Sequence, residues 1–184
     1  MLKDKVVIVT GGSGLIGREI VKDIVRKGGI AVNADIHVST DLNKREIYVD
    51  ISDEQSVREV IRTVCQKFGR IDGLVNCAYP RTKDWGTFFE EIPLDSWRKN
   101  VDLQLNSCFL FCQQVLEIMA EQGSGAIVNI ASIYGIVGND FTLYEGYGGT
   151  SPAAYSAIKG GIINFTRYLA SYYGRKGIRI NCVS

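Results

Sequence analysis

The sequence predicts an α/β fold in which a doubly wound parallel sheet is covered by helices on both faces, giving three layers, α/β/α. Short continuous apolar runs alternate with longer segments whose apolar residues recur at helical spacing, the pattern of parallel strands joined by crossover helices. The chain has 184 residues, of which 46% are hydrophobic and 22% charged, as in a globular domain with a sizeable core. We therefore expect residues 1–184 to form one domain.

A glycine-rich turn follows the first predicted strand, residues 5–10. Gly12, Gly14 and Gly17 form a G-x-G-x-x-G pattern, and a helical pattern then continues to the glycine pair at 28–29. Between a strand and a helix, such a turn lets backbone N–H groups approach a pyrophosphate at the positive end of the helix. We favour this dinucleotide site over a plain strand-to-helix turn. The residues predicted to contact the dinucleotide there are Gly11, Ser13, Gly14, Leu15, Ile16 and Gly17.

The second predicted strand, residues 30–35, ends in an acidic residue that indicates which dinucleotide binds. Asp35 lies 18 residues beyond Gly17 (35 − 17), close to the spacing of a carboxylate that accepts from an adenosine ribose. That carboxylate would repel a 2′-phosphate, no Arg or Lys follows it directly, and Ser13 stands in the glycine turn instead of a basic residue. The sequence favours NAD over NADP. The alternative is that Asp35 merely ends the strand.

Two further strands are expected at residues 46–50 and 71–76. Only ten residues (36–45) separate the second strand from the third, so we expect a loop or a single helical turn there. Asp53 is placed to cap a helix that runs to about Phe68. Ligands of such sheets bind beyond the carboxyl ends of the strands, which places strand-end residues near the cofactor. These residues are Asp50, Ile51, Asn76, Cys77 and Ala78.

The second half of the chain repeats the alternation after a long loop, residues 77–93. We expect a helix from about Leu94, another over residues 103–122 and a strand over 126–131, with Ser132 just past its end. A segment rich in glycine and aromatic residues, 138–150, precedes the last helix. Ser151 suits the N-cap of that helix and Pro152 its first helical position. The helix is expected to end near residue 173 and to be followed by a sixth strand over 178–183. Its predicted buried stripe is Ala154, Ile158, Gly161, Ile162, Phe165 and Leu169.

Tyr155 and Lys159 are four residues apart on that helix and therefore share one face. An ammonium group beside a phenol favours the phenolate and lowers its pKa. A tyrosine of this kind can exchange a proton with an alcohol or a carbonyl near neutral pH. Taken alone, the pair could equally mark a solvated helix face, so the rest of the chain must decide.

Together these features resemble the short-chain dehydrogenase/reductase family over the whole chain. The resemblance rests on the glycine turn, Asp35, Asp50-Ile51, Asn76-Cys77-Ala78, Ser132, Tyr155-Ser-Ala-Ile-Lys159 and Arg179-Ile-Asn-Cys-Val-Ser184. It implies a Rossmann-like NAD(P)-binding domain and hydride transfer between nicotinamide and a secondary alcohol or carbonyl. The pattern is also similar to members linked with bacterial surface-sugar synthesis.

The resemblance implies a role for each matching residue. Tyr155 would be the general acid/base, and Lys159 would lower its pKa and hold the nicotinamide ribose. Ser132 would hydrogen-bond the substrate oxygen, and Asp50 with Ile51 would flank the adenine. The resemblance also implies a homodimer or homotetramer, paired through the two helices before and after the fifth strand.

The chain departs from the family pattern at four places. The glycine turn ends in Leu-Ile-Gly instead of the usual Gly-Ile-Gly, and Tyr79 stands where a glycine usually follows the fourth strand. Gln104 matches the family's structural asparagine, where it would hold a relay water with different geometry. Ser132 and Tyr155 are 23 residues apart (155 − 132), and the excess is the 138–150 insertion.

The insertion is expected to lie over the site, because it leads into the helix that carries Tyr155. We predict a substrate pocket with aromatic and charged walls, which suits a sugar or nucleotide-sugar, including an acidic one. The alternative is that the aromatic residues pack on one another. The predicted substrate residues are Tyr79, Arg81, Tyr144 and Tyr147.

Composition argues against several other classes of protein. The formal net charge is +1 without a basic block, which argues against a nucleic-acid partner, and no apolar stretch is long enough to span a bilayer. Five scattered cysteines and one histidine indicate free thiols in a reducing compartment and no metal site. We expect a cytoplasmic protein that acts on a small molecule.

Family members continue well past the position of Ser184, so the resemblance implies that the usual last strand and helix are absent. The sixth strand would then be an edge strand. Two functions stay open at this point. The chain is either an NAD-dependent oxidoreductase, or a non-catalytic dinucleotide-binding module or inactive truncated remnant.

Overall fold

Six parallel strands form one sheet, in the order β3-β2-β1-β4-β5-β6, in the computed structural model, which describes residues 2–146 and 148–184. The chain enters in the middle of the sheet at β1, moves outward to β3, then crosses to β4 and moves outward to β6. This reversal confirms the predicted doubly wound sheet, and ligands of such sheets bind at the point of reversal. The strands are β1 (Val6–Thr10), β2 (Ile30–Asp35), β3 (Glu46–Tyr48), β4 (Gly73–Asn76), β5 (Gly125–Ile130) and β6 (Ile178–Val183).

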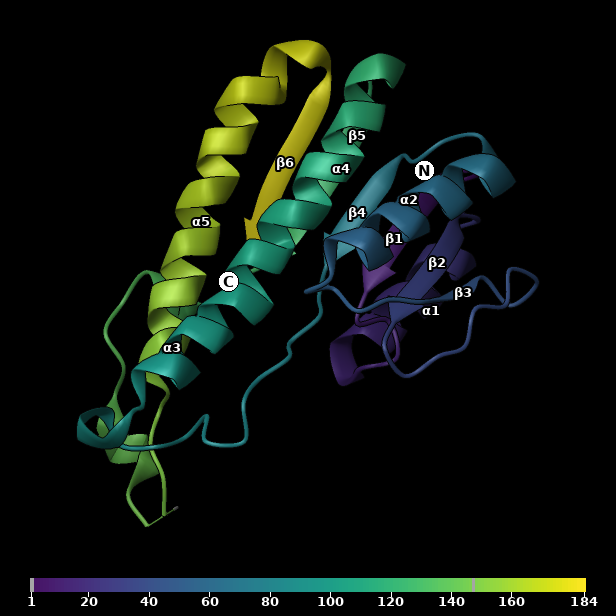
Figure 1. The fold of residues 1–184 in the computed structure, drawn as a ribbon. Coiled ribbons are helices and arrows are strands. Elements are labelled where there is room, and N and C mark those ends of the chain that lie inside the picture. The colour runs from purple at the N-terminus through teal and green to yellow at the C-terminus, as the bar shows by residue number, and fades with distance from the viewer. Residues whose placement is uncertain (1, 147) are drawn as a thin grey trace.

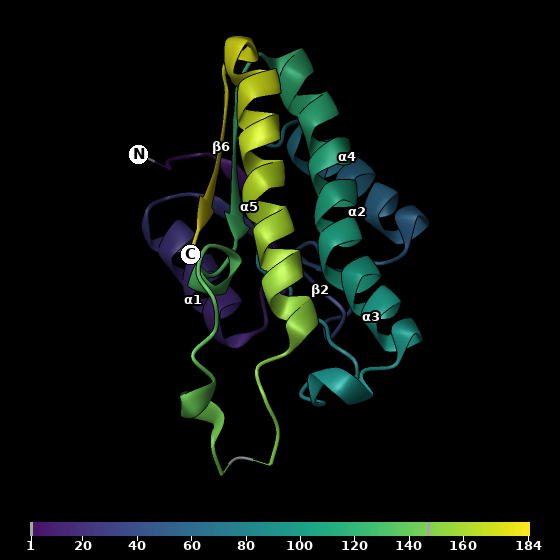
Figure 2. The ribbon, with the colours of Figure 1, turned by 90° about the vertical axis from the view of Figure 1, so that its left-hand side faces the viewer.

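Helices cover both faces of this sheet, as Figures 1 and 2 show. Helix α1 (Leu15–Arg26) lies on one face. The other face carries α2 (Glu54–Phe68), α4 (Ser107–Gln122) and α5 (Ala153–Tyr173). Because crossover connections are right-handed, the reversal of chain direction after β3 moves the later helices to the opposite face.

Each face has its own apolar core. The larger core lies between the sheet and α2, α4 and α5, and includes the fully buried Phe111, Leu74 and Ile127. The smaller core lies under α1 and contains Val7, Val9, Ile24 and Ala31. The short apolar runs therefore read as buried strands because both faces of β1 are covered.

The connections in the first half follow the predictions closely. Residues 36–45 join β2 to β3 without a helix. Asp53 caps α2, since its carboxylate accepts a hydrogen bond from the Gln55 backbone N–H at 2.8 Å. Strands β3 and β4 are each two residues shorter than the predicted segments 46–50 and 71–76.

The predicted break between the helices at residues 94 and 103 is wrong. Helix α3 (Leu94–Val101) continues through a π-helical turn (Asp102–Asn106) directly into α4. The segment contains no Pro or Gly that could end a helix, so a wider turn absorbs the change of direction. Such turns occur frequently at functional sites.

The predicted cap of the last helix is also wrong by one residue. Helix α5 begins at Ala153 with the extended Pro152 at the N-cap position, and no side chain caps it. Ser151 is buried, and its hydroxyl accepts a hydrogen bond from the Asn139 side chain. Ser151 therefore fastens the start of the insertion and leaves the helix end uncapped.

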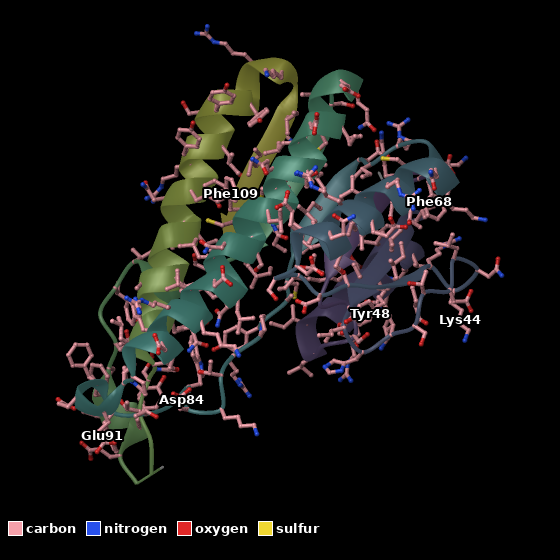
Figure 3. The ribbon with its side chains drawn as sticks, viewed as in Figure 1. Lys44, Tyr48, Phe68, Asp84, Glu91 and Phe109 are labelled. Carbon is pink, nitrogen blue, oxygen red and sulfur yellow. The ribbon has the colours of Figure 1, made fainter. Side chains whose placement is uncertain are left out.

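Two loops project together from one end of the molecule, below α3 and α5 in Figures 1 and 2. One contains residues 80–93 and the other the insertion, 138–150. The backbone N–H of Thr150 donates to the Gly86 carbonyl at 3.1 Å and joins the loops. Asp84 (Figure 3) accepts a hydrogen bond from Ser96 of α3 at 2.7 Å, which ties the first loop to the helix.

Gly17 is required by the close packing of α1 on the glycine turn. A Cβ atom at this position would lie 2.1 Å from the carbonyl oxygen of Gly11, whereas one at Gly14 would lie 3.2 Å from the same atom. The first contact is far below the sum of van der Waals radii, so the backbone would have to move.

We therefore expect Gly17→Ala to be destabilising by about 1–3 kcal/mol, as overpacked sites are, and to lower the melting temperature by roughly 2–10 °C. Gly14→Ala is the matched control and should lower the free energy of unfolding clearly less than Gly17→Ala does. Melting curves of the two variants followed by circular dichroism test this, and equal losses would contradict the packing argument.

Candidate active site

The carboxyl ends of β1, β4 and β5 meet at one edge of the sheet, and the predicted site residues gather there. Thr10 of β1 pairs with Asn76 of β4, and Asn76 with Asn129 of β5. Asp35 ends β2, and Ser132 lies two residues beyond β5. Residues from four strands are thus brought to one edge, as the parallel topology requires.

A groove of about 640 Å³ runs along this edge. Most of the residues predicted to bind the cofactor line it together. They are Gly11, Ser13, Gly14, Leu15, Ile16, Gly17, Asp35, Asp50, Ile51, Cys77 and Ala78. Tyr79 and Arg81, which were predicted to face the substrate, also line this groove, as do His37 and Leu103.

Asp35 is buried and connects the end of β2 to the glycine turn. Its two carboxylate oxygens accept hydrogen bonds from the backbone N–H groups of Ser13, at 3.0 Å, and His37, at 2.9 Å. The Ser13 hydroxyl in turn accepts from the Asn33 side chain at 3.0 Å. Asn33 was not predicted from the sequence, although a polar residue within an otherwise apolar strand could have indicated a role near the glycine turn.

The N-terminus of α1 faces the groove and is well suited to an anion. Gly14 occupies its N-cap without a side-chain hydrogen bond, and its first turn contains no acidic residue. The first backbone N–H groups and the positive end of the helix dipole are therefore free to meet a phosphate. Helix α2, capped by Asp53 and followed by Glu54, offers no such end. The turn and groove fit the dinucleotide that the sequence predicts.

Lys159 is buried in front of the end of β5. Its ammonium group donates to the Ile130 carbonyl at 2.6 Å and lies 5.5 Å from the ring centre of Tyr155. Only 6% of the residue is exposed, and burial lowers the pKa of the ammonium group. The ammonium has three donors, so the bond to Ile130 leaves others for the groove.

Tyr155 is part of an aromatic triad that the sequence did not reveal. Its ring contacts Tyr79 edge-on at 5.7 Å and Trp85 edge-on at 6.3 Å between ring centres. The indole N–H of Trp85 donates to the Tyr79 hydroxyl at 2.8 Å, which fixes the two rings together. Burial raises the pKa of Tyr79, so this hydroxyl stays protonated near neutral pH. The triad places an aromatic wall beside the predicted general acid/base.

Ser132 begins a short turn that packs closely on α5. Its hydroxyl accepts a hydrogen bond from the Tyr134 backbone N–H at 3.2 Å. A Cβ on Gly135, the third residue after Ser132, would lie 2.6 Å from the backbone carbonyl carbon of Lys159. This close approach fixes the Ser132 turn against the part of α5 that carries Lys159.

Gln104 is buried within the π-helical turn and holds the loop after β4. Its side-chain amide N–H donates to the Pro80 carbonyl at 2.8 Å. Its amide oxygen has no hydrogen-bond partner among the described residues. Gln104, Lys159, Asn76 and Asn129 line a cavity of about 20 Å³, enough for one water. Gln104 and Lys159 thus line the same small cavity, and the role of Gln104 in holding a relay water stays a prediction.

A buried polar network lies beneath the site. Asn76 donates from its side chain to the Asn129 side-chain oxygen at 2.8 Å, and Asn129 donates to the Thr166 hydroxyl of α5 at 2.9 Å. The free thiols of Cys108 and Cys112 lie beside these amides. The sequence predicted Asn76 to lie near the cofactor but missed Asn129 and Thr166, whose signal was polarity within apolar runs.

The insertion is fastened next to Tyr155. The Ser156 hydroxyl donates to the Asn139 side-chain oxygen at 2.7 Å. The neighbouring Tyr144 raises the pKa of the Tyr134 hydroxyl. Tyr147, also predicted to face the substrate, lies outside the described residues.

A second pocket, of about 500 Å³, lies between the two projecting loops. Phe88, Phe141 and Ser156 are among its lining residues.

Among residues 2–146 and 148–184, no cluster of three or more His, Cys, Asp or Glu side chains could hold a metal ion. None of the described helices is both long and apolar enough to cross a membrane.

Comparison with known proteins agrees with this geometry. Residues 5–184 match the model of the short chain dehydrogenase family. The post-translational flagellin modification protein A of Campylobacter coli is 33% identical over 197 residues, covering 100% of this chain and 77% of the relative. The 7alpha-hydroxysteroid dehydrogenase of Bacteroides fragilis is 33% identical over 193 residues, covering 99% of this chain and 71% of the relative.

A solved structure extends the comparison to the cofactor. The short chain dehydrogenase of Leptospira borgpetersenii, determined with bound NAD⁺, superimposes with a TM-score of 0.86 at 34% identity and covers 100% of this chain and 71% of its own. The chain therefore belongs to the short-chain dehydrogenase family and is an oxidoreductase that interconverts an alcohol and a carbonyl with a nicotinamide dinucleotide.

Proposed function

We propose that this enzyme uses NAD to interconvert a secondary alcohol and a carbonyl on a sugar or nucleotide-sugar, with Tyr155 as the general acid/base. The observation that carries the proposal is that the Tyr155 ring and the buried Lys159 ammonium both lie next to Tyr79, a residue that lines the groove beginning at the glycine turn. A proton-transfer group and a dinucleotide site at the same sheet edge are what hydride transfer requires.

In the oxidation direction, the Tyr155 phenolate takes the proton of the substrate hydroxyl while the dinucleotide supplies the hydride acceptor for the same carbon. Ser132 donates a hydrogen bond to the substrate oxygen, and Lys159 stabilises the phenolate and holds the nicotinamide ribose. Reduction runs these steps in reverse, with the proton returned by Tyr155.

The substrate class is inferred from the wall around Tyr155. Tyr79 and Trp85 present ring faces and edges there. The insertion, which carries Tyr144, is held next to Tyr155 by the hydrogen bond between Ser156 and Asn139. Aromatic rings next to polar groups suit the alternating apolar faces and hydroxyl groups of a sugar ring. The names of the relatives range from flagellin modification to a hydroxysteroid, so the substrate is argued from the pocket alone.

The purified protein should reduce NAD⁺ with a sugar, polyol or nucleotide-sugar from a panel that also contains simple secondary alcohols. Tyr155→Phe should lose about 10²–10⁴-fold in turnover, because the proton-transfer group is gone. Its melting temperature should still rise when NAD is added, since NAD binding is retained. Formation of NADH, followed by absorbance, is the measurement.

Tyr48→Phe is the matched control, because Tyr48 is an exposed tyrosine of β3 that does not line the groove, and it should keep full activity. Turnover of non-sugar alcohols alone would contradict the substrate class. NAD binding without turnover of any alcohol or ketone would favour the non-catalytic binding module.

The preference for NAD is inferred from Asp35. Its carboxylate lines the groove and is held by Ser13 and His37, so it would face the adenosine ribose in a fixed position. A 2′-phosphate would meet this charge at close range, and like charges in such contact cost several kcal/mol.

The parent should bind NAD roughly tenfold or more tightly than NADP. Asp35→Asn keeps a side chain of the same shape but removes the charge. The ratio of the dissociation constants for NADP and NAD should therefore become smaller. Dissociation constants from isothermal titration calorimetry measure this. Tighter binding of NADP by the parent would overturn the assignment of Asp35.

The assembly is inferred to be a homodimer or homotetramer built on α4 and α5. The outward face of these helices carries Phe109 (Figure 3), Tyr168 and Tyr172, with exposed fractions of 48%, 61% and 59%. Phe109 packs against Phe165 of α5 at 6.0 Å between ring centres, so the apolar surface is continuous across both helices. Large contiguous apolar surfaces often mark protein interfaces.

Light scattering should therefore give the mass of two or four chains, and Phe109→Asp should shift the mass toward one chain. Tyr48→Asp is the control, because Tyr48 of β3 is equally exposed, at 47%, but lies far from these helices in Figure 3. A monomeric parent, or equal effects of both variants, would refute the interface.

A further inference from the structure

Arg81 is a cation without an acidic partner at the wall of the dinucleotide groove. It lies on the loop after β4, five residues beyond Asn76, and lines the groove together with the glycine turn. Among the residues that the structure describes, no carboxylate forms an ion pair with it, although ten other ion pairs are present. Arg81 is exposed and no carboxylate of the described residues neutralises its guanidinium, so the group is available to an anionic ligand of the groove.

The backbone on both sides of Arg81 is fixed by two buried amides. Gln104 donates to the Pro80 carbonyl at 2.8 Å. Asn100 accepts from the Thr82 backbone N–H at 3.1 Å and donates to the Thr82 hydroxyl at 2.8 Å. These amides lie four residues apart on one helical face and are only 3% and 5% exposed. Burying such groups is costly unless they are bonded, so the positions next to Arg81 are strongly defined.

The side chain of Arg81 is also restricted. Its guanidinium carbon lies 5.6 Å from the ring centre of Tyr79, which is itself held by the Trp85 indole N–H. Stacking on an aromatic ring limits the rotamers of arginine while leaving its N–H groups available to an anion. The group is therefore pre-organised, and less entropy is lost when it binds.

The same groove is lined by a second positive region, the N-terminus of α1 with its free backbone N–H groups. Asp35 and Asp50 line the rest of the groove and would repel an anionic group placed next to them. An anion in this groove is therefore directed to the region between the glycine turn and Arg81.

We propose that Arg81 donates to the pyrophosphate of the dinucleotide together with the glycine turn, as a second phosphate-binding element. The inference rests on the proposed use of NAD. An arginine suits this position because its planar fork can bind two phosphate oxygens at once, which a lysine cannot do.

An acidic group on the substrate is the other possible anion for Arg81. The pocket between the projecting loops, lined by Phe88, Phe141 and Ser156, does not include Arg81. Arg81 instead shares its groove with Gly14 and Asp35, residues of the dinucleotide site. The location of the guanidinium therefore favours the dinucleotide, and the experiment below separates the two sources.

The test compares binding of NAD, NADP, ADP and adenosine to the parent, Arg81→Ala and Arg81→Lys by isothermal titration calorimetry. ADP carries the phosphates and adenosine does not. Arg81→Ala should raise the dissociation constants of NAD and ADP by about tenfold or more, as expected for a lost charge-assisted hydrogen bond, and should leave the dissociation constant of adenosine unchanged. Arg81→Lys should be intermediate, because it keeps the charge but loses the fork.

Lys83→Ala is the matched control, because Lys83 is an exposed cation of the same loop that does not line the groove. It should bind all ligands as the parent does. Equal effects of Arg81→Ala and Lys83→Ala on binding would show that only the net positive charge of the loop matters, and would overturn the proposal.

Three other outcomes would also overturn the proposal. Unchanged NAD and ADP affinity with a raised substrate KM would assign Arg81 to an acidic substrate. Weakening of NADP alone would assign it to the 2′-phosphate. Weakening of adenosine would assign it to the nucleoside. Failure of the parent to bind any dinucleotide would instead contradict the proposed function, so the two failures are distinguishable.

Discussion

The geometry of the site depends on one amide pair, the half-buried Asn76 and the fully buried Asn129. Their hydrogen bond joins the carboxyl ends of β4 and β5, and Asn129 extends the network to Thr166 of α5. Leaving either amide unpaired in this interior would cost about 1–3 kcal/mol, so the three elements satisfy their polar groups in one relative placement. The same helix carries Tyr155 and Lys159. The position of the proposed proton-transfer group, Tyr155, therefore depends on polar contacts beneath the site as well as on the apolar core around them.

A second pair of amides defines the other side of the site. Asn100 and Gln104 lie on the helix that passes through the π-helical turn, and they hold the loop that carries Tyr79 and Arg81. A loop after a strand is ordinarily among the more mobile parts of a domain. Here the buried side chains of Gln104 and Asn100 fix the loop backbone at residues 80 and 82. The loop can therefore present its own side chains to a ligand with little loss of conformational entropy. The departure of Gln104 from the family pattern is accommodated because its longer side chain reaches the Pro80 carbonyl.

The sequence was most informative where local rules decide the structure. The glycine turn, Asp35 and the Tyr155–Lys159 pair could be placed because a parallel sheet brings its carboxyl ends to one edge and a helix puts residues four apart on one face. It was less informative where contacts between distant loops decide. Trp85 reaches Tyr155 through the folding of two long loops, for which no periodicity exists. Ser151 was predicted to cap the helix, but its hydroxyl bonds to Asn139 of the insertion instead. No local pattern in the sequence indicates that contact.

Tyr79 explains why the cofactor and substrate parts of this site form one surface. The family pattern has a glycine at this position, which would leave a gap between the groove and Tyr155. Here the ring is contacted by Arg81 on the groove side, stands 5.7 Å from the Lys159 ammonium and meets the edge of Tyr155. A ligand that moves the ring toward either side must change its contact with the other. Under the proposed function, specificity for the dinucleotide and specificity for the substrate therefore share the Tyr79 side chain, and a substitution at this residue is expected to change both.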